Sequence, residues 1–522
     1  MKAFKWLPAV AAVSLALTGC GSDSKSGGGP GPTPPPTTKY TWKIVNLYKD
    51  QASNVAPSCA VFKKHIDEVT PANSYVVAAR MATSGYKVTY HRANGSIIAE
   101  YTLSGTALSA LNGSITINAD NLPDDGYVAI EEWEGKNAGN RESYIFAVQK
   151  DLLQDMTITI REPQDGNACY TGDDVPDALK NNQTKISVSS NGGPKWIQTS
   201  ASDGKTSTGN ESQLLGLPVY ANSPASERKL VTSFATIYNS ESDKLDDLIS
   251  YGVANSSDVY TGSTAPNIVA LGGATEFANY NLTITDLTVA STGVVSTVLD
   301  NKVYAWQPVF NKAPQLSLSY APSDSSLSHW SMSLETKLLA ANGSWNFSIG
   351  KVVDGNAMDL QRPTDLSNFS STDISTARCV ADSNGYSVHC LDANSFNAGS
   401  WQVQRTHVRA TTDNSKAMFQ TIYAKPSQTQ VLIQSETEKV STGASDKVAV
   451  GLAKSNGVDK KALMKDLASR SLDVGVIVDD LAPDAHKYDL NGVLLLNSES
   501  NALVLEQMQL NRDYVTNSVN WP

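Results

Sequence analysis

Charged residues, histidines and cysteines are all scarce in this chain of 522 residues. Only 18% of its residues are charged, and its six histidines and five cysteines are widely scattered. It contains no His-Glu-x-x-His segment, with which a zinc protease holds its metal. It also contains no Gly-x-Ser-x-Gly segment, the strained turn on which many serine hydrolases expose their nucleophile. The sequence therefore favours a non-enzymatic protein over either of these enzyme classes.

A short apolar run opens the chain. Lys2 and Lys5 precede residues 6–17, which are mostly apolar. Because a membrane-spanning helix needs ~20 apolar residues, this run is too short to cross a bilayer. A basic start followed by a short apolar run is typical of a cleavable secretion signal. We therefore expect residues 1–19 to be a signal peptide.

The signal ends in a leucine, two small residues and a cysteine, Leu17-Thr18-Gly19-Cys20. This segment resembles the bacterial lipobox, in which the cysteine receives the lipid and the chain is cut directly before it. The resemblance implies that Cys20 becomes the acylated first residue of the mature protein. Several acyl chains anchor a protein stably, at ~0.8 kcal/mol per buried CH₂. Gly21 stands where Gram-negative lipoproteins of the inner membrane carry aspartate, so the resemblance implies the outer membrane. The alternative is an ordinary secretory signal with an accidental cysteine.

The stretch after Cys20 has the composition of a tether. Residues 21–39 contain five glycines, five prolines and no aliphatic side chain, so they have nothing to bury. We therefore expect residues 20–39 to form a lipidated, disordered tether. Without the signal the chain has 39 basic and 52 acidic residues, a net charge of −13. Because an acidic protein is repelled by phosphate backbones, we do not expect nucleic acid as a partner. The expected partner is the membrane, through the N-terminal lipid, with other envelope proteins or glycans as further candidates.

Four cysteines follow the anchor: Cys59, Cys169, Cys379 and Cys390. An even number suits an exported protein, in which disulfides persist, and three pairings are possible. Cys379 and Cys390 lie symmetrically about residues 384–385, an Asn-Gly pair that favours a two-residue hairpin. Such a hairpin would place them directly opposite each other on antiparallel strands, and Cys59 would then pair with Cys169 by elimination. Metal ligation by the four thiolates is the alternative, but no Cys-x-x-Cys occurs.

Turn signals and strand-like segments alternate along the chain and predict a mainly β fold. Asn-Gly occurs seven times, and this dipeptide favours hairpin turns. Around residues 94–95 we expect a hairpin that places Val88 opposite Tyr101. The other candidate strands are residues 42–47, 114–117, 127–133, 144–148, 156–160, 281–289, 315–320, 330–334, 345–349, 401–408, 418–424, 431–435 and 474–478.

Helical spacing of apolar residues predicts three short helices, at residues 57–69, 242–252 and 459–470. The strand pattern predicts tandem β-sandwich domains of the immunoglobulin-like type with these few helices. We expect a β-sandwich at 40–180, a polar linker or long loops at 181–230, a large β domain at 231–450, and a C-terminal α+β segment at 451–522.

The densest polar cluster is a candidate ion site. It consists of Asp479, Asp480, Asp484, His486 and Asp489, directly after an apolar strand-like segment. Clustered carboxylates are the ligands that a hard cation such as calcium prefers. The EF-hand glycine and spacing are missing, and a solvated loop is the alternative. Calcium is the one cofactor that the sequence suggests.

Two further candidates point to carbohydrate. Glu132 and Glu134 would lie on one strand face ~7 Å apart, near the separation of glycosidase carboxylates, although paired acids on an exposed strand are commonplace. Trp196 stands in a polar stretch, and an exposed indole there could stack on a sugar ring. The alternative is that the tryptophans fill sandwich cores.

The leading hypothesis is an outer-membrane-anchored surface lipoprotein with a structural or adhesive role, such as a component of a sheath or other surface appendage. The lipobox, the long tether and the acidic β body motivate it. A glycan-binding or glycan-processing lipoprotein is the first alternative. A periplasmic assembly factor for an envelope complex is the second.

Overall fold

The structure is a computed structural model that describes a body of mainly β-strands within residues 38–520. The described part leaves out residues 68, 135–141, 161–167, 176–178, 189–195, 202–205, 211–214, 221–227, 242, 256–267, 272–276, 313–315, 339–344, 362, 364–365, 367–373, 382–386, 394–397, 428, 437, 442–445, 471 and 473–491. The predicted fold class, mainly β with few short helices, is confirmed.

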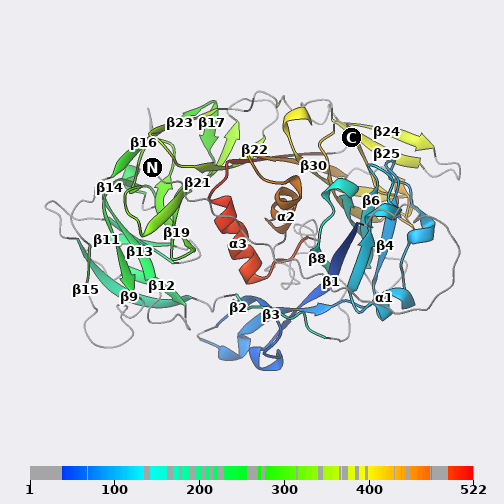
Figure 1. Cartoon of the computed structure of the whole chain (residues 1–522), viewed down its shortest axis with the longest axis horizontal. Coiled ribbons are helices and arrows are strands. Elements are labelled where there is room, and N and C mark those ends of the chain that lie inside the picture. Colours follow the sequence, from blue (N-terminus) through cyan, green and yellow to red (C-terminus); the bar gives the residue numbers. More distant parts are fainter. Residues whose placement is uncertain are drawn as a thin grey trace, which may run out of the picture. The chain divides into compact units, whose positions relative to one another are not determined.

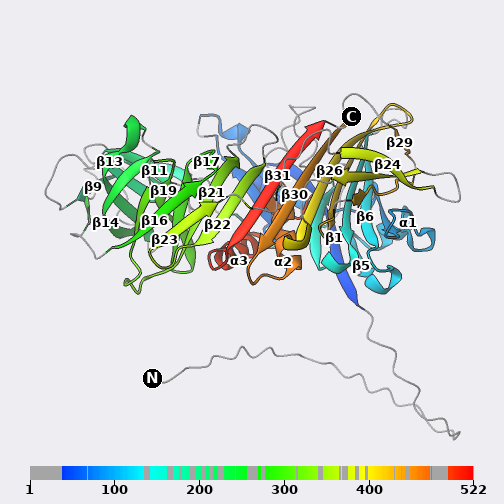
Figure 2. The ribbon, with the colours of Figure 1, turned by 90° about the horizontal axis from the view of Figure 1, so that it is seen from above.

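One large sheet runs through the body, and Figure 2 looks onto several of its strands side by side. In spatial order they are β19 (Lys302–Val309), β18 (Gly293–Leu299), β21 (Leu327–Leu338), β22 (Asn346–Val352), β31 (Arg512–Asn520), β30 (Lys447–Ser455), β26 (Val403–Thr412), β27 (Ala417–Ala424), β7 (Glu142–Gln149), β6 (Tyr127–Glu134) and β4 (Tyr86–His91). The short strands β17 (Leu287–Val289) and β29 (Val440–Ser441) pair with β21 and β26.

A second sheet is built from the first part of the described chain. Its strands are β1 (Lys39–Asp50), β2 (Val61–His65), β3 (Tyr75–Met81), β5 (Ser114–Asn118) and β8 (Met156–Ile160). β1 is an interior strand: it pairs with β5 and β3 antiparallel and with β8 parallel.

Four smaller groups of strands, three α-helices and several three-residue 3₁₀ helices complete the described elements (Figure 1). The strands are β10 (Trp196–Ser200), β11 (Thr206–Asn210), β13 (Arg228–Ile237) and β14 (Leu245–Asn255); β9 (Leu179–Val188), β12 (Leu215–Tyr220) and β15 (Ile268–Leu271); β16 (Ala278–Thr285), β20 (Leu316–Tyr320) and β23 (Ala357–Gln361); and β24 (Ile374–Ala381), β25 (Ser387–Ala393) and β28 (Thr429–Val431). The helices are α1 (Thr106–Ala110), α2 (Lys460–Arg470) and α3 (Asn497–Gln507). None of the helices that the structure describes has the length and apolar character needed to cross a bilayer.

The large sheet separates two hydrophobic cores, because successive side chains of a strand point to opposite faces. Ala129 of β6 and Ala147 of β7 join the first core, whereas Val128 and Val148 join the second. The first core also contains Tyr280, Trp306, Trp330, Trp345, Phe347 and Trp401. The second also contains Trp42, Ile44, Ile115, Ile117, Leu463, Met464 and Tyr514. Two sandwich-like cores thus share one sheet.

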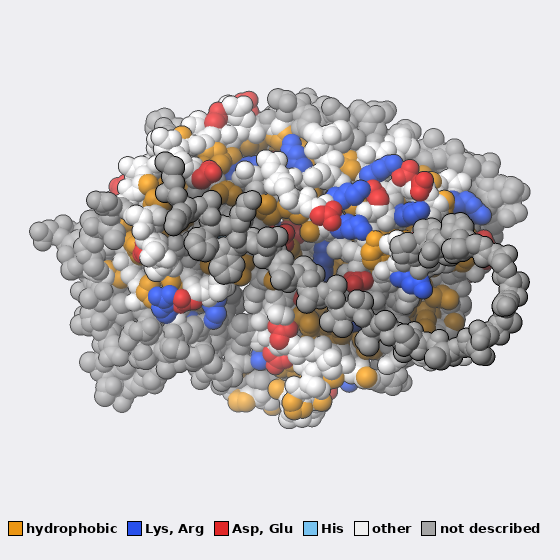
Figure 3. Space-filling view, viewed as in Figure 1, with side chains coloured by type: hydrophobic (Ala, Val, Ile, Leu, Met, Phe, Trp, Pro, Cys, Tyr) orange, Lys and Arg blue, Asp and Glu red, His pale blue; other side chains and the backbone are white. Residues whose placement is uncertain are grey.

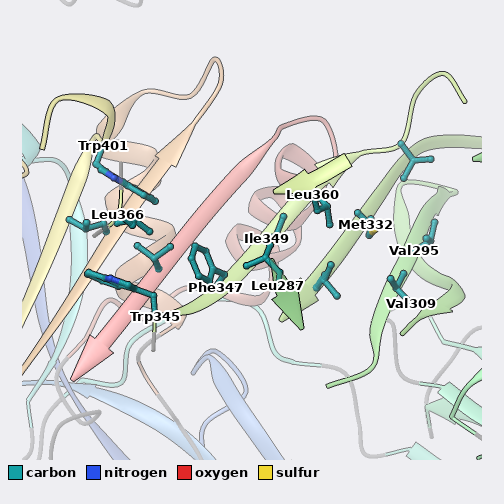
Figure 4. Packing of buried hydrophobic residues seen from close by; sticks show 14 of the residues in the cluster. Leu287, Val295, Val309, Met332, Trp345, Phe347, Ile349, Leu360, Leu366 and Trp401 are labelled. Atoms are coloured by element: carbon teal, nitrogen blue, oxygen red, sulfur yellow. The ribbon is translucent and has the colours of Figure 1, made fainter. Parts of the chain in front are cut away.

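Figure 4 shows part of the first core around β22. Phe347 and Ile349 belong to alternate positions of this strand and are 1% and 5% exposed. The indole-bearing residues Trp345 and Trp401 are buried in the same cluster with Leu366. Tryptophan burial supplies much of the apolar area of this layer, as expected of a sandwich core.

Strands from distant parts of the sequence meet in the large sheet. β7 pairs in parallel with β27, so residues 142–149 lie beside residues 417–424. β22 pairs antiparallel with β31. The divisions that the sequence suggested near residues 180, 230 and 450 therefore do not coincide with the edges of this sheet.

Two of the predicted helices are strands. Residues 57–69 contain β2, and residues 242–252 lie mostly in β14. β2 pairs with β3, and β14 pairs with β13 along its whole length. Short apolar spacings fit either period, and the long-range ladders decide the outcome. The prediction at residues 459–470 is confirmed by α2.

Two predicted strand arrangements are also wrong. Val88 lies opposite Leu103 instead of Tyr101, because Ala99–Tyr101 forms a 3₁₀ turn. The strand expected at residues 431–435 ends at Val431, and the chain continues irregularly across the large sheet.

Candidate functional site

The anchor and the acidic cluster of the sequence lie outside the described residues. Cys20 precedes Thr38, where the description begins, and Asp479, Asp480, Asp484, His486 and Asp489 all fall within residues 473–491. Lipidation and calcium binding there stay predictions. Elsewhere in the described parts of the chain, no group of three or more His, Cys, Asp or Glu side chains could hold a metal ion.

The disulfide between Cys59 and Cys169 is present, with Cα atoms 5.4 Å apart. Cys59 lies just before β2, and Cys169 forms an isolated antiparallel β-bridge with Arg80 of β3. β24 and β25 pair antiparallel as predicted, but the predicted direct opposition is wrong: a bulge interrupts the register beside Cys379, and Cys390 lies opposite Ala377. The side chains of these two cysteines lie outside the described part, so their bond stays a prediction.

The residues that suggested carbohydrate are not freely exposed. Trp196 of β10 is half-buried and packs against the first core, because the sheet of β10, β11, β13 and β14 covers that core. Glu132 and its neighbour Glu131 are each 1% exposed, so the alternative of paired acids on an exposed strand does not hold for Glu132. The side chain of Glu134 lies outside the described residues.

A segment that crosses the large sheet on the side of the first core buries Glu131. We name residues 429–436 the strap. Ser435 Oγ and the Glu436 backbone N–H both donate to the Glu131 carboxylate. Gln420 fastens the strap at Ile433 with two bonds of 2.7 and 2.8 Å. Burial raises the pKa of Glu131 to about 7, against the smaller opposing effect of these hydrogen bonds.

A cavity of about 360 Å³ lies beside α2 and α3, and it is the candidate binding site. We name it the α2–α3 cavity. Most of its lining is apolar, and its apolar side chains are Phe62, Val175, Leu472, Val493, Leu494, Leu495, Leu503 and Val504. Its polar side chains are Asp466, Ser469, Arg470, Asn497, Ser500 and Gln507.

One face of α2 packs in the second core, and another face lines the α2–α3 cavity together with residues of α3. Leu463 and Leu467 of α2 enter the second core, whereas Asp466 and Arg470 face the cavity. Leu463 and Leu467 are four residues apart and share one helical face, and the same holds for Asp466 and Arg470. Val504 of α3 is 39% exposed at the cavity.

Asp466 organises the polar end of the cavity. It is 3% exposed, and its carboxylate accepts hydrogen bonds from Gln507 Nε2 and the Tyr514 hydroxyl. Arg470 Nε donates to the same carboxylate at 2.9 Å. Arg512 Nη1 lies 3.6 Å from Asp466 Oδ2. One carboxylate thus receives two guanidinium groups.

Arg470 is held in place but keeps an exposed surface. Its Nη2 donates to Gln507 Oε1 at 2.9 Å, and 42% of its side chain is exposed. Burial is the largest single effect and lowers the pKa of Arg470, but attraction by Asp466 and Tyr514 and the hydrogen bond to Asp466 together outweigh it, so the pKa is raised. Glu335, exposed on β21, adds a smaller attraction.

Arg512 is more deeply buried, at 8% exposure, and its pKa is lowered by burial and then by repulsion from Arg470. Its Nε and Nη1 atoms have no hydrogen-bond partner among the described residues. Asp466 and Arg470 line the cavity, and Arg512 adds a second positive charge in contact with Asp466 outside the lining, so the three groups together are positive. Such an arrangement can recognise an anion.

A second cavity of about 380 Å³ lies next to the disulfide. Its lining includes Cys59, Lys64, His65, Tyr75 and Asp174. Lys64 Nζ and Asp174 Oδ2 are 3.5 Å apart, so its charges already pair within the lining. On the face that Figure 3 shows, basic side chains likewise lie among acidic ones rather than in a separate patch.

Sequence reasoning missed the α2–α3 cavity because it missed α3. The segment is mostly polar, so no apolar stripe at helical spacing marks it in the sequence. Leu503, Val504 and Gln507 share the face that lines the cavity. One local signal was present: Glu499, in the first turn, accepts from the Leu496 backbone N–H at 2.9 Å. Arg512 begins a strand 42 residues after Arg470, so no local pattern joins the two.

Comparison with known proteins adds no relative: no family model matches the chain, and no curated protein matches it either.

Proposed function

We propose that the protein is an outer-membrane-anchored surface lipoprotein with a structural or adhesive role. The lipobox at Cys20 supports the anchor, and the composition of residues 21–39 supports a tether. The disulfide between Cys59 and Cys169 supports export, since such bonds persist in oxidising compartments. A component of a sheath or other surface appendage is one such role.

The observation that carries the proposal is how the tether joins the body. β1 begins at Lys39, the last residue of the expected tether, and its residues 42, 43, 45 and 46 have a paired strand on each side. Residues 42–43 pair with β5 on one side and β8 on the other. A pull on the lipid would therefore act on β1, in which one ladder holds residues 39–41 and two ladders hold residues 42–43.

Side-chain contacts fix the start of β1 as well. The Tyr40 hydroxyl accepts from Lys461 Nζ of α2 at 2.9 Å. The Thr41 backbone N–H donates to Asp155 at 2.7 Å, and Trp42 Nε1 donates to the Gln154 carbonyl at 3.1 Å. These contacts suit a protein whose anchor must transmit force to its body.

Replacement of the anchor cysteine tests the proposal. In a strain that lacks the native protein, Cys20→Ser should take up no palmitate analogue, leave the membrane fraction and fail to restore adhesion or appendage structure. Ser22→Ala, which keeps Cys20, is the control and should behave as the native protein does. A soluble Cys20→Ser protein that restores the full phenotype would overturn the proposal.

A further inference from the structure

We propose that the α2–α3 cavity binds an amphiphile with an apolar chain and a carboxylate head, such as a medium-chain fatty acid. This inference is independent of the proposed surface role. It assigns a ligand class to a site formed by α2, α3, Phe62 of β2 and Val175.

The size and lining of the cavity suit a short apolar chain. At about 360 Å³ the cavity lies at the lower end of the ~300–1,000 Å³ range of small-molecule pockets. Eight of its fourteen lining side chains are aliphatic or aromatic hydrocarbons. Each methylene buried against them contributes about 0.8 kcal/mol.

The charge of the polar end selects the head group. Arg470 lines the cavity, and Arg512 contacts Asp466 without lining the cavity. The two guanidinium groups share the single carboxylate of Asp466, so these three groups carry a net charge of one positive unit. One carboxylate on the ligand would balance this charge. A guanidinium also offers paired N–H donors with the spacing of a carboxylate's two oxygens.

Arg470 is the residue that would meet the head group. Asp466 and Gln507 hold its Nε and Nη2 atoms, which fixes the orientation of the guanidinium before a ligand arrives. Among the described residues, no acceptor bonds its Nη1 atom. A donor that is already oriented loses little side-chain entropy on binding.

Titration with ligands that share a chain and differ in head group tests the inference. The probes are decanoate and decyltrimethylammonium, each below its critical micelle concentration. The protein is the full mature chain with Cys20→Ser, so that its own lipid and detergent do not compete. Decanoate should bind at least ten-fold more tightly than decyltrimethylammonium and should raise the melting temperature more.

Three variants locate the site. Arg470→Gln should weaken decanoate binding ten-fold or more, and Arg470→Lys, which keeps the charge but loses the paired donors, should weaken it less than Arg470→Gln does. Val504→Trp should block both probes by filling the cavity mouth. Lys465→Gln is the matched control on α2, since Lys465 pairs with Glu499 and does not line the cavity, and it should change nothing.

The head-group comparison in the unaltered cavity and the Val504→Trp result do not depend on how Arg470 variants fold. Equal affinity for the two probes, no binding of decanoate, or full binding by Val504→Trp would each overturn the inference.

Discussion

At the scale of single residues, the buried carboxylate of Asp466 joins several polar side chains. Its carboxylate accepts from Gln507, Tyr514 and Arg470 and lies near Arg512, all close to the second core. A buried carboxylate that serves several donors is costly to remove, because its partners are left unpaired.

We therefore expect Asp466→Ala to lower the free energy of unfolding by about 3–5 kcal/mol, as for other buried ion pairs that lose one partner. Urea unfolding followed by circular dichroism measures this loss. Asp124→Ala is the control, because the fully exposed Asp124 pairs with Lys150 at the surface and should contribute less than about 1 kcal/mol. Equal losses in the two variants would contradict the account.

Glu131 makes stability depend on pH. Burial raises its pKa in the folded protein to about 7 from an ordinary value of 4.5. The fold therefore favours the protonated acid, and this contribution is fully present below pH 4.5 and lost as the pH rises through 7. Lys87 opposes the shift and Glu436 adds to it.

Relative to Glu131→Gln, which stays neutral, the native protein should lose about 3 kcal/mol of unfolding free energy between pH 4.5 and pH 8. Urea unfolding of both proteins across this range tests the prediction. A stability difference that stays constant with pH would show that Glu131 does not titrate in this range.

The sequence could not reveal the burial of Glu131. Alternation along β6 predicts which residues share a face, and it places Glu131 with Ala129. Whether that face is covered depends on Ser435 and its neighbours, about 300 residues further along the chain. The same pattern is therefore compatible with an exposed strand and with a buried one.

At the scale of elements, local patterns predicted most strands and failed where long-range pairing decides. α2 was predictable because Leu463 and Leu467 repeat at helical spacing over 11 residues. β2 was taken for a helix because its apolar residues also fit that spacing, while its ladder to β3 and the disulfide at Cys59 cannot be read locally.

We expect the disulfide to stabilise the fold chiefly by closing a loop in the unfolded chain, which lowers the conformational entropy of the unfolded state. Cys59 and Cys169 are 110 residues apart, so Cys59→Ser/Cys169→Ser should cost about 2–5 kcal/mol of unfolding free energy. Urea unfolding under non-reducing conditions measures it. The predicted bond between Cys379 and Cys390 would close a loop of only 11 residues, so Cys379→Ser/Cys390→Ser should cost less. A long-loop variant as stable as the native protein would contradict this role.

At the scale of the whole molecule, the large sheet joins segments that no sequence window contains together. β7 and β27 pair in parallel across about 270 residues, and β31 closes beside β22. The sequence predicted the fold class, α2 and one disulfide. It could not predict the shared sheet or the α2–α3 cavity, since both depend on which distant segments meet.

The central claim is that a lipid tether presents this body at the cell surface, and trypsin added to intact cells tests it most directly. Lys25 lies within the tether and offers a cleavage site. We expect trypsin to release a soluble fragment that begins at Ser26 or later, with the disulfide between Cys59 and Cys169 intact. A protein that is released only after the outer membrane is permeabilised would contradict a surface role and favour a periplasmic one.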